Sequence, residues 1–399
     1  MKSQARLSFY LTLKYLQRGR KWTLVLIFIL MSVAFVNLIF VSSLFTGIID
    51  GANKQIVDTM TGNIYMTPSD GQDFINNKDN VLKKIADVNG VKSVSARTQV
   101  PARLSYKNIR GNWQILAINP ENEKQVSIVA DKMIEGSFLN VDDENQIVVG
   151  RQIAGGDNVE ENAFSFKGAK VGEKVTLLFD GMSEEFTIKG IFNTKFVESD
   201  KRAFISEKEL NKLIPSTKDK ANMIAIKTDT KDETKVLDQI KALNLDANIY
   251  SWQEATGLMK SVASSFLSVN ILITIVGILI AAVTVFIVIY VDIVNKRKQI
   301  GILRAIGIKP YIIISSYVIL SAVYSVIGVL IGSVVFYFVL VPYFNAHPFS
   351  LPICDATLIL SKADYISRAE MIMWVSVISG LIPSAIITRT KMLDAISGR

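Results

Sequence analysis

The sequence predicts an α-helical membrane protein with four transmembrane helices, arranged one plus three, and a large extracytoplasmic α+β domain of two subdomains. Half of the 399 residues are hydrophobic, and the apolar residues gather into four long runs that contain no charged side chain. A run of about 20 apolar residues is long enough to cross the hydrocarbon core as a helix. A long and mostly polar segment separates the first run from the other three, and it is large enough to fold around a core of its own.

The four runs define membrane spans at residues 22–49, 263–291, 312–341 and 371–388. The third run is longer than the bilayer is thick, so its helix must tilt or protrude. The fourth contains Gly380 and Pro383 and lies near the lower length limit. A cleaved signal peptide is the alternative for the first run. Because that run is about twice as long as the apolar core of a signal peptide, we expect it to be retained.

Lys and Arg set the predicted orientation. They gather in residues 1–21 and 292–311, and more of them follow the fourth span in the tail 389–399. Short loops rich in Lys and Arg stay in the cytoplasm, so we expect these three segments to be cytoplasmic. Segments 50–262 and 342–370 would then be extracytoplasmic. The net charge of +8 reflects this topology and an attraction to anionic lipid, and it does not indicate nucleic-acid binding.

The basic segment 1–21 also carries apolar residues at helical spacing, among them Leu7, Tyr10 and Leu11. This pattern is typical of an amphipathic helix that lies in the membrane interface. A set of anchoring charges before a membrane span is the alternative.

The polar segment 50–262 has the pattern of a mixed α+β domain. Short apolar runs separated by Gly and Asp predict strands, and Ser206 with Glu209 forms a capping box for a short helix that ends before Pro215. We expect a β-rich lobe over about residues 120–215, inserted between two α+β pieces that pair into one subdomain.

No catalytic, cofactor-binding or metal-binding site is predicted. The sequence has one histidine, His347, and one cysteine, Cys354, which are too few for a metal site or an intramolecular disulfide. Residues 168–175 superficially resemble a phosphate loop, but their spacing is wrong. The four apolar runs hold no ionisable side chain, which argues against a carrier driven by protons or sodium. The energy for any transport must therefore come from elsewhere.

The segment 292–311 is the main candidate site. Ile300, Leu303 and Gly307 fall on one side of a short helix, and basic residues surround them. We predict that this segment docks a partner protein, whereas an anchor on anionic lipid is the alternative. The predicted site residues are Arg297, Lys298, Gln299, Ile300, Gly301, Leu303, Arg304 and Gly307.

Small and polar residues in the spans indicate close helix packing. The third span carries Ser321, Ser325, Gly328 and Gly332 along one stripe, which suits tight contact within the chain or across a dimer. Asn37 and Asn270 are expected to form hydrogen bonds between helices.

The stretch 296–307, with the sequence KRKQIGILRAIG, resembles the coupling segment of the type VII ABC transporter permeases. This family contains the macrolide exporters, the lipoprotein-release permeases and the FtsX-like cell-division permeases. The ending, Gly380 to Ala385 followed by Arg389 and Asp394 to Ile396, and the first span are also similar to the family. In the polar segment, three further stretches look most like the lipoprotein-release branch: residues 118–120, 148–154, and 190–192 with 198–200. Gln299 and Leu320 depart from the family pattern, where acidic or amide residues are common.

The resemblance implies a non-catalytic permease in a bacterial inner membrane, bound to a dimer of cytoplasmic ABC ATPases that use ATP and Mg²⁺. It also implies a second permease copy or a paralogue, and membrane lipids as partners. A lipoprotein cargo would enter sideways between the first two spans, where it could contact the apolar residues Phe40, Leu44, Ile48, Phe266 and Ile273. The alternative for these residues is that they simply face the lipid of the membrane. Efflux of drugs or peptides, as in the macrolide exporters, and FtsX-like signal transmission without transport are the alternatives.

Overall fold

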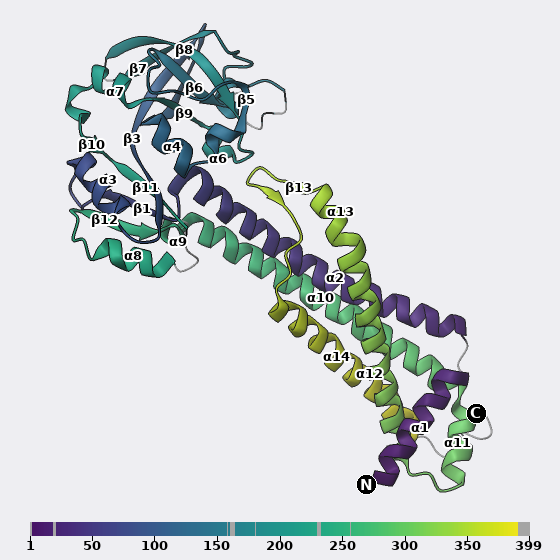
Figure 1. Cartoon of the computed structure of the whole chain (residues 1–399). Coiled ribbons are helices and arrows are strands. Elements are labelled where there is room, and N and C mark those ends of the chain that lie inside the picture. Colours follow the sequence, from purple (N-terminus) through teal and green to yellow (C-terminus); the bar gives the residue numbers. More distant parts are fainter. Residues whose placement is uncertain are drawn as a thin grey trace. The chain divides into compact units, whose positions relative to one another are not determined.

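The structure of the chain is a computed structural model that describes residues 2–18, 21–157, 159, 164–179, 181–229, 233–255 and 257–389. The side chains of residues 2–6, 18, 23, 255–267 and 387–389 lie outside this description. The chain divides into two compact units (Figure 1). The helical unit comprises Met1–Ile48, Ala263–Phe349 and Ala356–Arg399, and the α+β unit comprises Ile49–Val262 and Ser350–Asp355.

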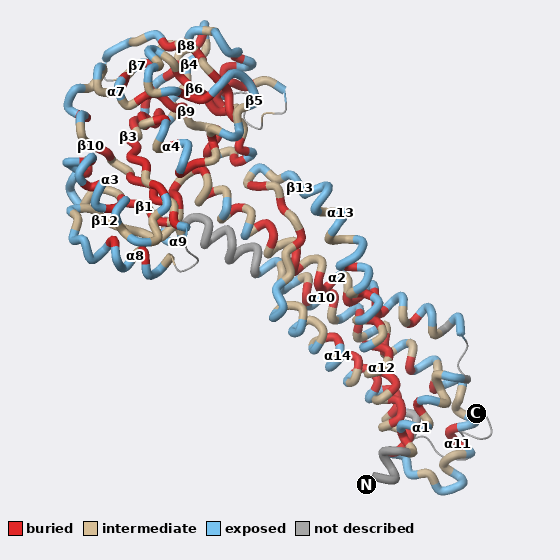
Figure 2. The backbone as a smooth tube through the Cα atoms, in the orientation of Figure 1, coloured by how far each residue is buried: buried red, intermediate tan, exposed pale blue. Residues whose placement is uncertain are grey.

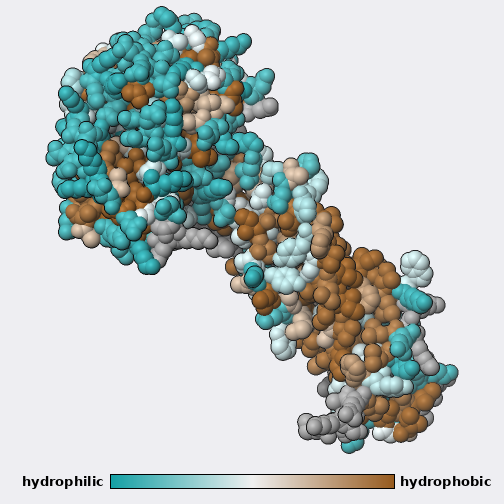
Figure 3. Space-filling view, viewed as in Figure 1, coloured by the Kyte–Doolittle hydropathy of each residue, from teal (hydrophilic) through white to brown (hydrophobic). Residues whose placement is uncertain are grey.

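Four helices in the described residues are long and apolar enough to cross a membrane, as the sequence predicts. They are α2 (Lys21–Ile56), α10 (Gly257–Asn295), α12 (Pro310–Val335) and α14 (Lys362–Arg389). α12 continues through the π-helical turn η5 (Phe336–Leu340) into α13 (Val341–Ala346), and α2 continues into a second such turn, η1 (Val57–Thr61). Hydrophobic residues cover much of the surface of the helical unit, whereas hydrophilic residues cover the α+β unit (Figure 3).

The fourth span differs from its prediction. α14 begins at Lys362 and not at residue 371, so the expected loop 342–370 is reduced to α13, the short strands β13 (Phe349–Ser350) and β14 (Asp355–Ala356), and their connections. Asp364, Arg368 and Glu370 therefore belong to a helix that is long enough to span the membrane. This helix therefore begins with ionisable side chains that the predicted span 371–388 does not include, and Arg368 among them donates to hydroxyls on α2 and α10.

The core of the helical unit is built from α2, α10, α12 and α14. Phe35 and Ile39 of α2, Ile289 of α10 and Leu320 of α12 are fully buried in it. Gly328 of α12 lies so close to Met31 of α2 that a Cβ atom at this glycine would sit 2.5 Å from the Met31 Cβ. Such close approach between helices is the use of small residues in membrane proteins.

The N-terminal segment forms a helix, α1 (Lys2–Arg18), which packs against α12. The hydroxyls of Ser8 and Thr12 donate hydrogen bonds to the carbonyls of Ile312 and Ser316, at 3.3 and 2.9 Å. Tyr15 stacks on Tyr317 with 5.2 Å between ring centroids. The opposite face of α1 exposes three apolar side chains, Phe9, Tyr10 and Leu13. This exposed apolar face would suit a helix that lies in the membrane interface. The position of α1 in that interface stays a prediction.

The α+β unit is organised by one mixed sheet of ten strands. In the order β12-β1-β11-β3-β4-β9-β6-β8-β5, neighbouring strands are hydrogen-bonded, and β7 pairs with β3 and β8. The strands are β1 (Ile64–Pro68), β3 (Val91–Tyr106), β4 (Ile109–Ile118), β5 (Met133–Gly136), β6 (Gln146–Gly150), β7 (Lys174–Phe179), β8 (Met182–Phe192), β9 (Arg202–Ser206), β11 (Met223–Thr228) and β12 (Ala247–Ser251). β2 (Ile75–Asn76) and β10 (Lys220–Ala221) form a separate pair.

The helices of the α+β unit are short. They are α3 (Lys78–Ala86), α4 (Pro120–Val126), η2 (Val129–Lys132), α5 (Arg151–Ala154), α6 (Val197–Asp200), α7 (Glu207–Leu213), η4 (Pro215–Thr217), α8 (Glu233–Lys241) and α9 (Trp252–Ala255). The predicted cap of α7 is present, since the Ser206 hydroxyl accepts a hydrogen bond from the Lys208 amide at 3.3 Å. Glu209 binds Lys212 instead of completing the capping box.

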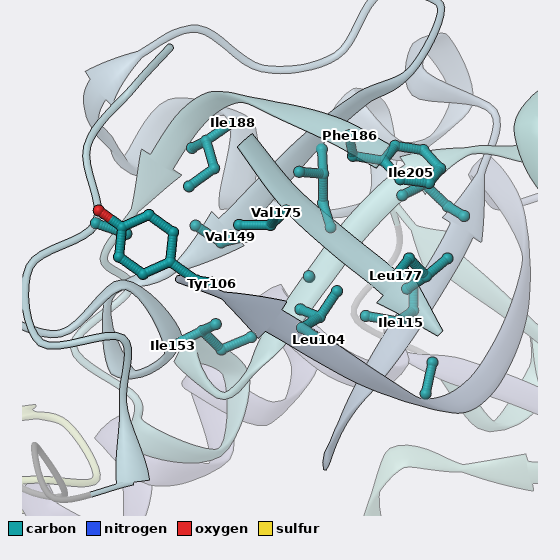
Figure 4. Packing of buried hydrophobic residues seen from close by; sticks show 14 of the residues in the cluster. Leu104, Tyr106, Ile115, Val149, Ile153, Val175, Leu177, Phe186, Ile188 and Ile205 are labelled. Atoms are coloured by element: carbon teal, nitrogen blue, oxygen red, sulfur yellow. The ribbon is translucent and has the colours of Figure 1, made fainter. Parts of the chain in front are cut away.

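Two main hydrophobic cores lie along this sheet, and buried residues follow its strands (Figure 2). One core joins Ile64, Ile85 and Ile224, from the two ends of the segment, so the flanking pieces pair as expected. The other core is that of the β-rich lobe (Figure 4), and it includes Val100, Leu104 and Ile115. The lobe therefore begins near residue 100 and not near 120. The reason is that β3 is one strand, whose first part pairs with β11 and whose last part pairs with β4 and β7.

A buried carboxyl group makes the stability of the α+β unit depend on pH. Asp200 is 2% exposed, and its Oδ1 atom accepts hydrogen bonds from the backbone amide and the hydroxyl of Thr194 at 2.9 and 2.7 Å. Burial outweighs these bonds and raises the pKa of Asp200 from 3.8 to about 6. The native state therefore holds this proton in a pH range where the unfolded chain has lost it.

We expect the free energy of unfolding to fall by about 3 kcal/mol as the pH rises from about 4 to 6, because a raised carboxyl pKa favours the native state only while the group is protonated. Asp200→Asn should remove this fall, since the amide oxygen still accepts both bonds from Thr194. Urea unfolding of the detergent-solubilised chain measures this through the fluorescence of Trp113 and Trp252, with Trp22→Phe and Trp374→Phe in the background. An unchanged pH profile in the Asn variant would contradict the assignment to Asp200.

Candidate coupling segment and its surroundings

The predicted coupling segment forms a short helix, α11 (Arg297–Ala305), directly after α10. Its start is fixed by Lys296, whose Nζ atom lies 2.8 Å from the Asp292 carboxylate and 4.4 Å from the centroid of the Tyr15 ring. α10, α11 and α1 therefore meet at one side chain.

The predicted site residues do not all share one face of α11. Ile300 is 2% exposed and belongs to the core of the helical unit together with Ile293 and Ile313, and Gly301 is also buried. Half-buried positions are Arg297, Leu303 and Arg304, and exposed positions are Lys298, Gln299 and Gly307.

Two exposed apolar residues of this segment, Ile302 and Ile306, at 52% and 70% exposure, were missed by the sequence argument. They stand four residues apart, so they share one helical face. Sequence reasoning placed Ile300 on the face that is presented to a partner, but Ile300 is buried because it faces α10 and α12. The i, i+4 spacing of two isoleucines would have identified the pair once Ile300 was assigned to the core.

Gly307 has a structural role of its own. It adopts φ of 95°, its amide donates to the carbonyl of Arg304, and the amide of Ile308 donates to the carbonyl of Leu303, both at 3.1 Å. This is the Schellman arrangement that ends a helix, in which glycine avoids the strain of a left-handed backbone. The presence of Gly307 is explained without a docked partner.

The stripe of small residues on α12 is used inside the chain. Gly328 and Gly332 lie against Met31 and Phe35 of α2, and Ser321 lies against Gly380 of α14. Ser325 is fully buried and donates to the carbonyl of Ala322 at 2.8 Å. These four residues are covered by neighbouring helices of the same chain, so they are not available for contact with a second copy.

Of the five residues expected to face a substrate, four have described side chains, and none of these four is exposed; that they face a substrate stays a prediction. Phe40 packs on Phe344 with 5.6 Å between ring centroids, Leu44 is half-buried beside it, and Ile48 is 8% exposed. Ile273 is half-buried, and the side chain of Phe266 lies outside the described residues. Exposed apolar side chains occur on all four long helices, and those of α10 include Ile271, Leu272, Ile275, Val276, Leu279 and Ile280.

The far end of α2 is attached firmly to the rest of the α+β unit. The Asp58 carboxylate lies 2.5 Å from the Nζ atom of Lys227 on β11, and the Gln55 amide donates to the carbonyl of Thr194 at 3.1 Å. The guanidinium of Arg97 on β3 donates to the carbonyl of Met60. Three side chains, Asp58, Gln55 and Arg97, therefore connect the end of this helix to other parts of the α+β unit.

Both halves of the chain match known families. Residues 25–243 match the MacB-like periplasmic core domain, and residues 271–392 match the FtsX-like permease C-terminal domain. The chain belongs to the MacB- and FtsX-like permeases of ABC transporters. The expected family is therefore confirmed, whereas membership of the lipoprotein-release branch stays a prediction.

The permease is similar to the "Putative hemin transport system permease protein HrtB" of Staphylococcus haemolyticus (strain JCSC1435), with 24% identity over 302 residues, 71% of this chain and 74% of that protein. It is also similar to the extracellular domain of the ABC-type transporter YknZ from Gram-positive bacteria, with 13% identity, a TM-score of 0.35, and coverage of 47% of this chain and 98% of that domain. The periplasmic region of MacB from Actinobacillus actinomycetemcomitans gives 14% identity, a TM-score of 0.37, and coverage of 51% and 95%.

As a permease subunit of an ABC transporter, the chain works with an ATPase partner. Within the described ranges there is no group of three or more His, Cys, Asp or Glu residues that could hold a metal ion. That the chain itself binds no cofactor stays a prediction.

Proposed function

We propose that this permease couples ATP hydrolysis by a cytoplasmic ATPase to the export of an amphipathic, membrane-dissolved substrate, for which hemin is the first candidate. The name of the staphylococcal relative, a hemin transport permease, supports this substrate class. The exposed apolar face of α10 offers a surface for such a molecule. The predicted topology places α11 and both termini in the cytoplasm and the α+β unit outside a bacterial inner membrane.

The proposed mechanism rests on two sets of contacts, one that holds α11 to α10 and one that holds the end of α2 to the sheet. α11 is held to α10 by Ile300 and by the Lys296–Asp292 ion pair, and the end of α2 is held to the sheet by Asp58, Gln55 and Arg97. A push of the ATPases on α11 would move the helical unit, and α2 would carry this movement into the α+β unit. The working assembly would contain two ATPases, which use ATP and Mg²⁺, and a second permease copy or a paralogue.

The test measures ATP hydrolysis by the complex of the permease and its ATPase, purified together and reconstituted into lipid vesicles. We expect hemin to stimulate hydrolysis and a soluble peptide to have no effect. Lipoprotein release stays a prediction that rests on the resemblance to that branch. Stimulation by a lipidated protein, together with indifference to hemin, would replace our proposal with it, and indifference to every substrate would favour FtsX-like signalling.

A further inference from the structure

Arg368 of α14 places a guanidinium between two other membrane helices. Its Nη1 atom donates to the hydroxyl of Thr274 on α10 at 3.0 Å, and its Nη2 atom donates to the hydroxyl of Ser42 on α2 at 3.4 Å. Ser42 and Thr274 are both buried, while Arg368 is half-buried. The side chain is therefore anchored inside the helical unit but remains reachable from its surface.

The charge of Arg368 is not balanced by an acidic side chain among the described residues. Two of the five N–H groups of a guanidinium are used by the two hydroxyls, which leaves three. On the same helix, Asp364 accepts a hydrogen bond from Ser361 at 2.6 Å, and Glu370 is exposed, but neither forms an ion pair with Arg368. Neutral hydroxyls orient the guanidinium without neutralising it.

An unpaired cation within a membrane helix is costly and marks a functional position. The guanidinium is also the group that binds carboxylate and phosphate in a bidentate manner. The hydroxyl of Thr274, which accepts from Arg368, also donates to the amide oxygen of Asn270 at 3.5 Å.

The neighbouring surface suits the rest of an amphipathic molecule. Within one turn of Thr274, α10 exposes Ile271, Leu272 and Ile275. An apolar body lying on these side chains would place an attached anionic group within reach of Arg368. A charged head beside an apolar surface is the arrangement expected for a ligand that partitions into the bilayer.

We propose that Arg368, oriented by Ser42 and Thr274, is the binding site for the anionic group, a carboxylate or a phosphate, of an amphipathic ligand seated on α10. The proposal rests on the proposed function for the identity of that ligand. With hemin the group is a propionate carboxylate, and with a phospholipid it is the phosphate of an anionic headgroup.

The test measures ligand binding by the permease–ATPase complex in nanodiscs of phosphatidylcholine. Hemin is titrated by absorbance and compared with hemin dimethyl ester, in which both carboxylates are neutral. Arg368→Gln should weaken hemin binding about 10- to 100-fold, the loss expected for a charge-assisted hydrogen bond, and should leave the binding of the ester unchanged. Lys362→Gln, at an exposed lysine of the same helix, is the matched control and should bind hemin like the parent protein.

A second variant keeps the proposal testable if Arg368→Gln fails to fold. Arg368→Lys keeps the charge but loses the bidentate geometry, so its preference for hemin over the ester should be intermediate. In a second arm, the complex is purified from membranes that contain phosphatidylglycerol, and the lipid it retains is extracted and measured. A lower retention in Arg368→Gln with unchanged hemin binding would keep the anion site and identify its ligand as lipid.

The failure of the site and the failure of the proposed function are distinguishable. If the parent protein binds no hemin while anionic lipid is retained in an Arg368-dependent way, the substrate proposal fails and the site stands. If the parent binds hemin, and Arg368→Gln matches it for both hemin affinity and lipid retention, the site proposal is overturned.

Discussion

Replacing Glu123 by glutamine should destabilise the α+β unit by about 3–5 kcal/mol, the range for removing one partner of a buried ion pair. Glu123 of α4 and Arg97 of β3 are each 1% exposed. The Glu123 carboxylate receives hydrogen bonds from Nε and Nη2 of Arg97 at 3.0 and 2.7 Å, and from the Ser95 hydroxyl at 2.8 Å. Neutralising Glu123 leaves the Arg97 charge buried without compensation.

A second arginine makes this loss more severe. Burial and the neighbouring Arg97 guanidinium lower the pKa of Arg202 to about 10, whereas the Glu123 carboxylate opposes that effect. Without Glu123, the buried guanidinium of Arg97 and the half-buried guanidinium of Arg202 still repel each other, but the Glu123 carboxylate no longer offsets that repulsion. Because Arg97 also donates to the carbonyl of Met60 in η1, directly after α2, the variant should loosen the attachment of this segment to the sheet.

Urea unfolding followed by Trp113 and Trp252 fluorescence measures this change. Lys174→Gln is the control, since it breaks an exposed ion pair with Glu185 and should leave the free energy of unfolding almost unchanged. The double variant Arg97→Met with Glu123→Leu should recover most of the loss, because an apolar pair carries no buried charge. A Glu123→Gln protein as stable as the control would show that the pair does not contribute to the fold.

The four spans were predictable because the absence of charge over a long run is a property of the sequence alone. The start of α14 was not, since Asp364, Arg368 and Glu370 end the apolar run while the helix continues. What allows it to continue is the pair of hydroxyls on α2 and α10 that receive Arg368. Partners from distant parts of the chain are not visible in a local pattern.

The boundary of the β-rich lobe failed for a related reason. Proline cannot donate to a sheet, yet β3 includes Pro101 and runs for 16 residues, so one strand serves both cores. Gln99 turns its amide to the side chain of Asn222, at 2.7 Å, and alternate residues of a strand face the same edge. The backbone nitrogen of Pro101 therefore faces that same edge, at a position between the residues of β3 that pair with β11 and those that pair with β7. No hydrogen bond from a backbone amide to a neighbouring strand is required there.

The coupling segment was also predictable only in part. Its basic and amphipathic character is visible in the sequence, but the face already covered by α10 and α12 is not. For this reason Ile300 was assigned to the docking surface, whereas Ile302 and Ile306 form the exposed apolar pair.

The double variant Ile302→Asp with Ile306→Asp should reduce recovery of the ATPase with the permease by more than about tenfold. Burying two isoleucines at an interface contributes about 1.5–3 kcal/mol each, and a carboxylate buried in their place would cost more than is gained. Arg297→Glu with Arg304→Glu should have the same effect, since the segment is basic and its partner must complement that charge.

Co-purification of the tagged permease with its ATPase measures this loss, and the permease recovered in the membrane fraction is quantified alongside. Ile134→Asp, at an isoleucine of β5 that is 47% exposed, is the control and should retain the ATPase. Ile300→Ala should act differently, by lowering the thermal stability of the helical unit, because it leaves a cavity in the core. If the aspartate pair keeps the ATPase but lowers recovery from the membrane, α11 is a lipid anchor and the docking prediction is wrong.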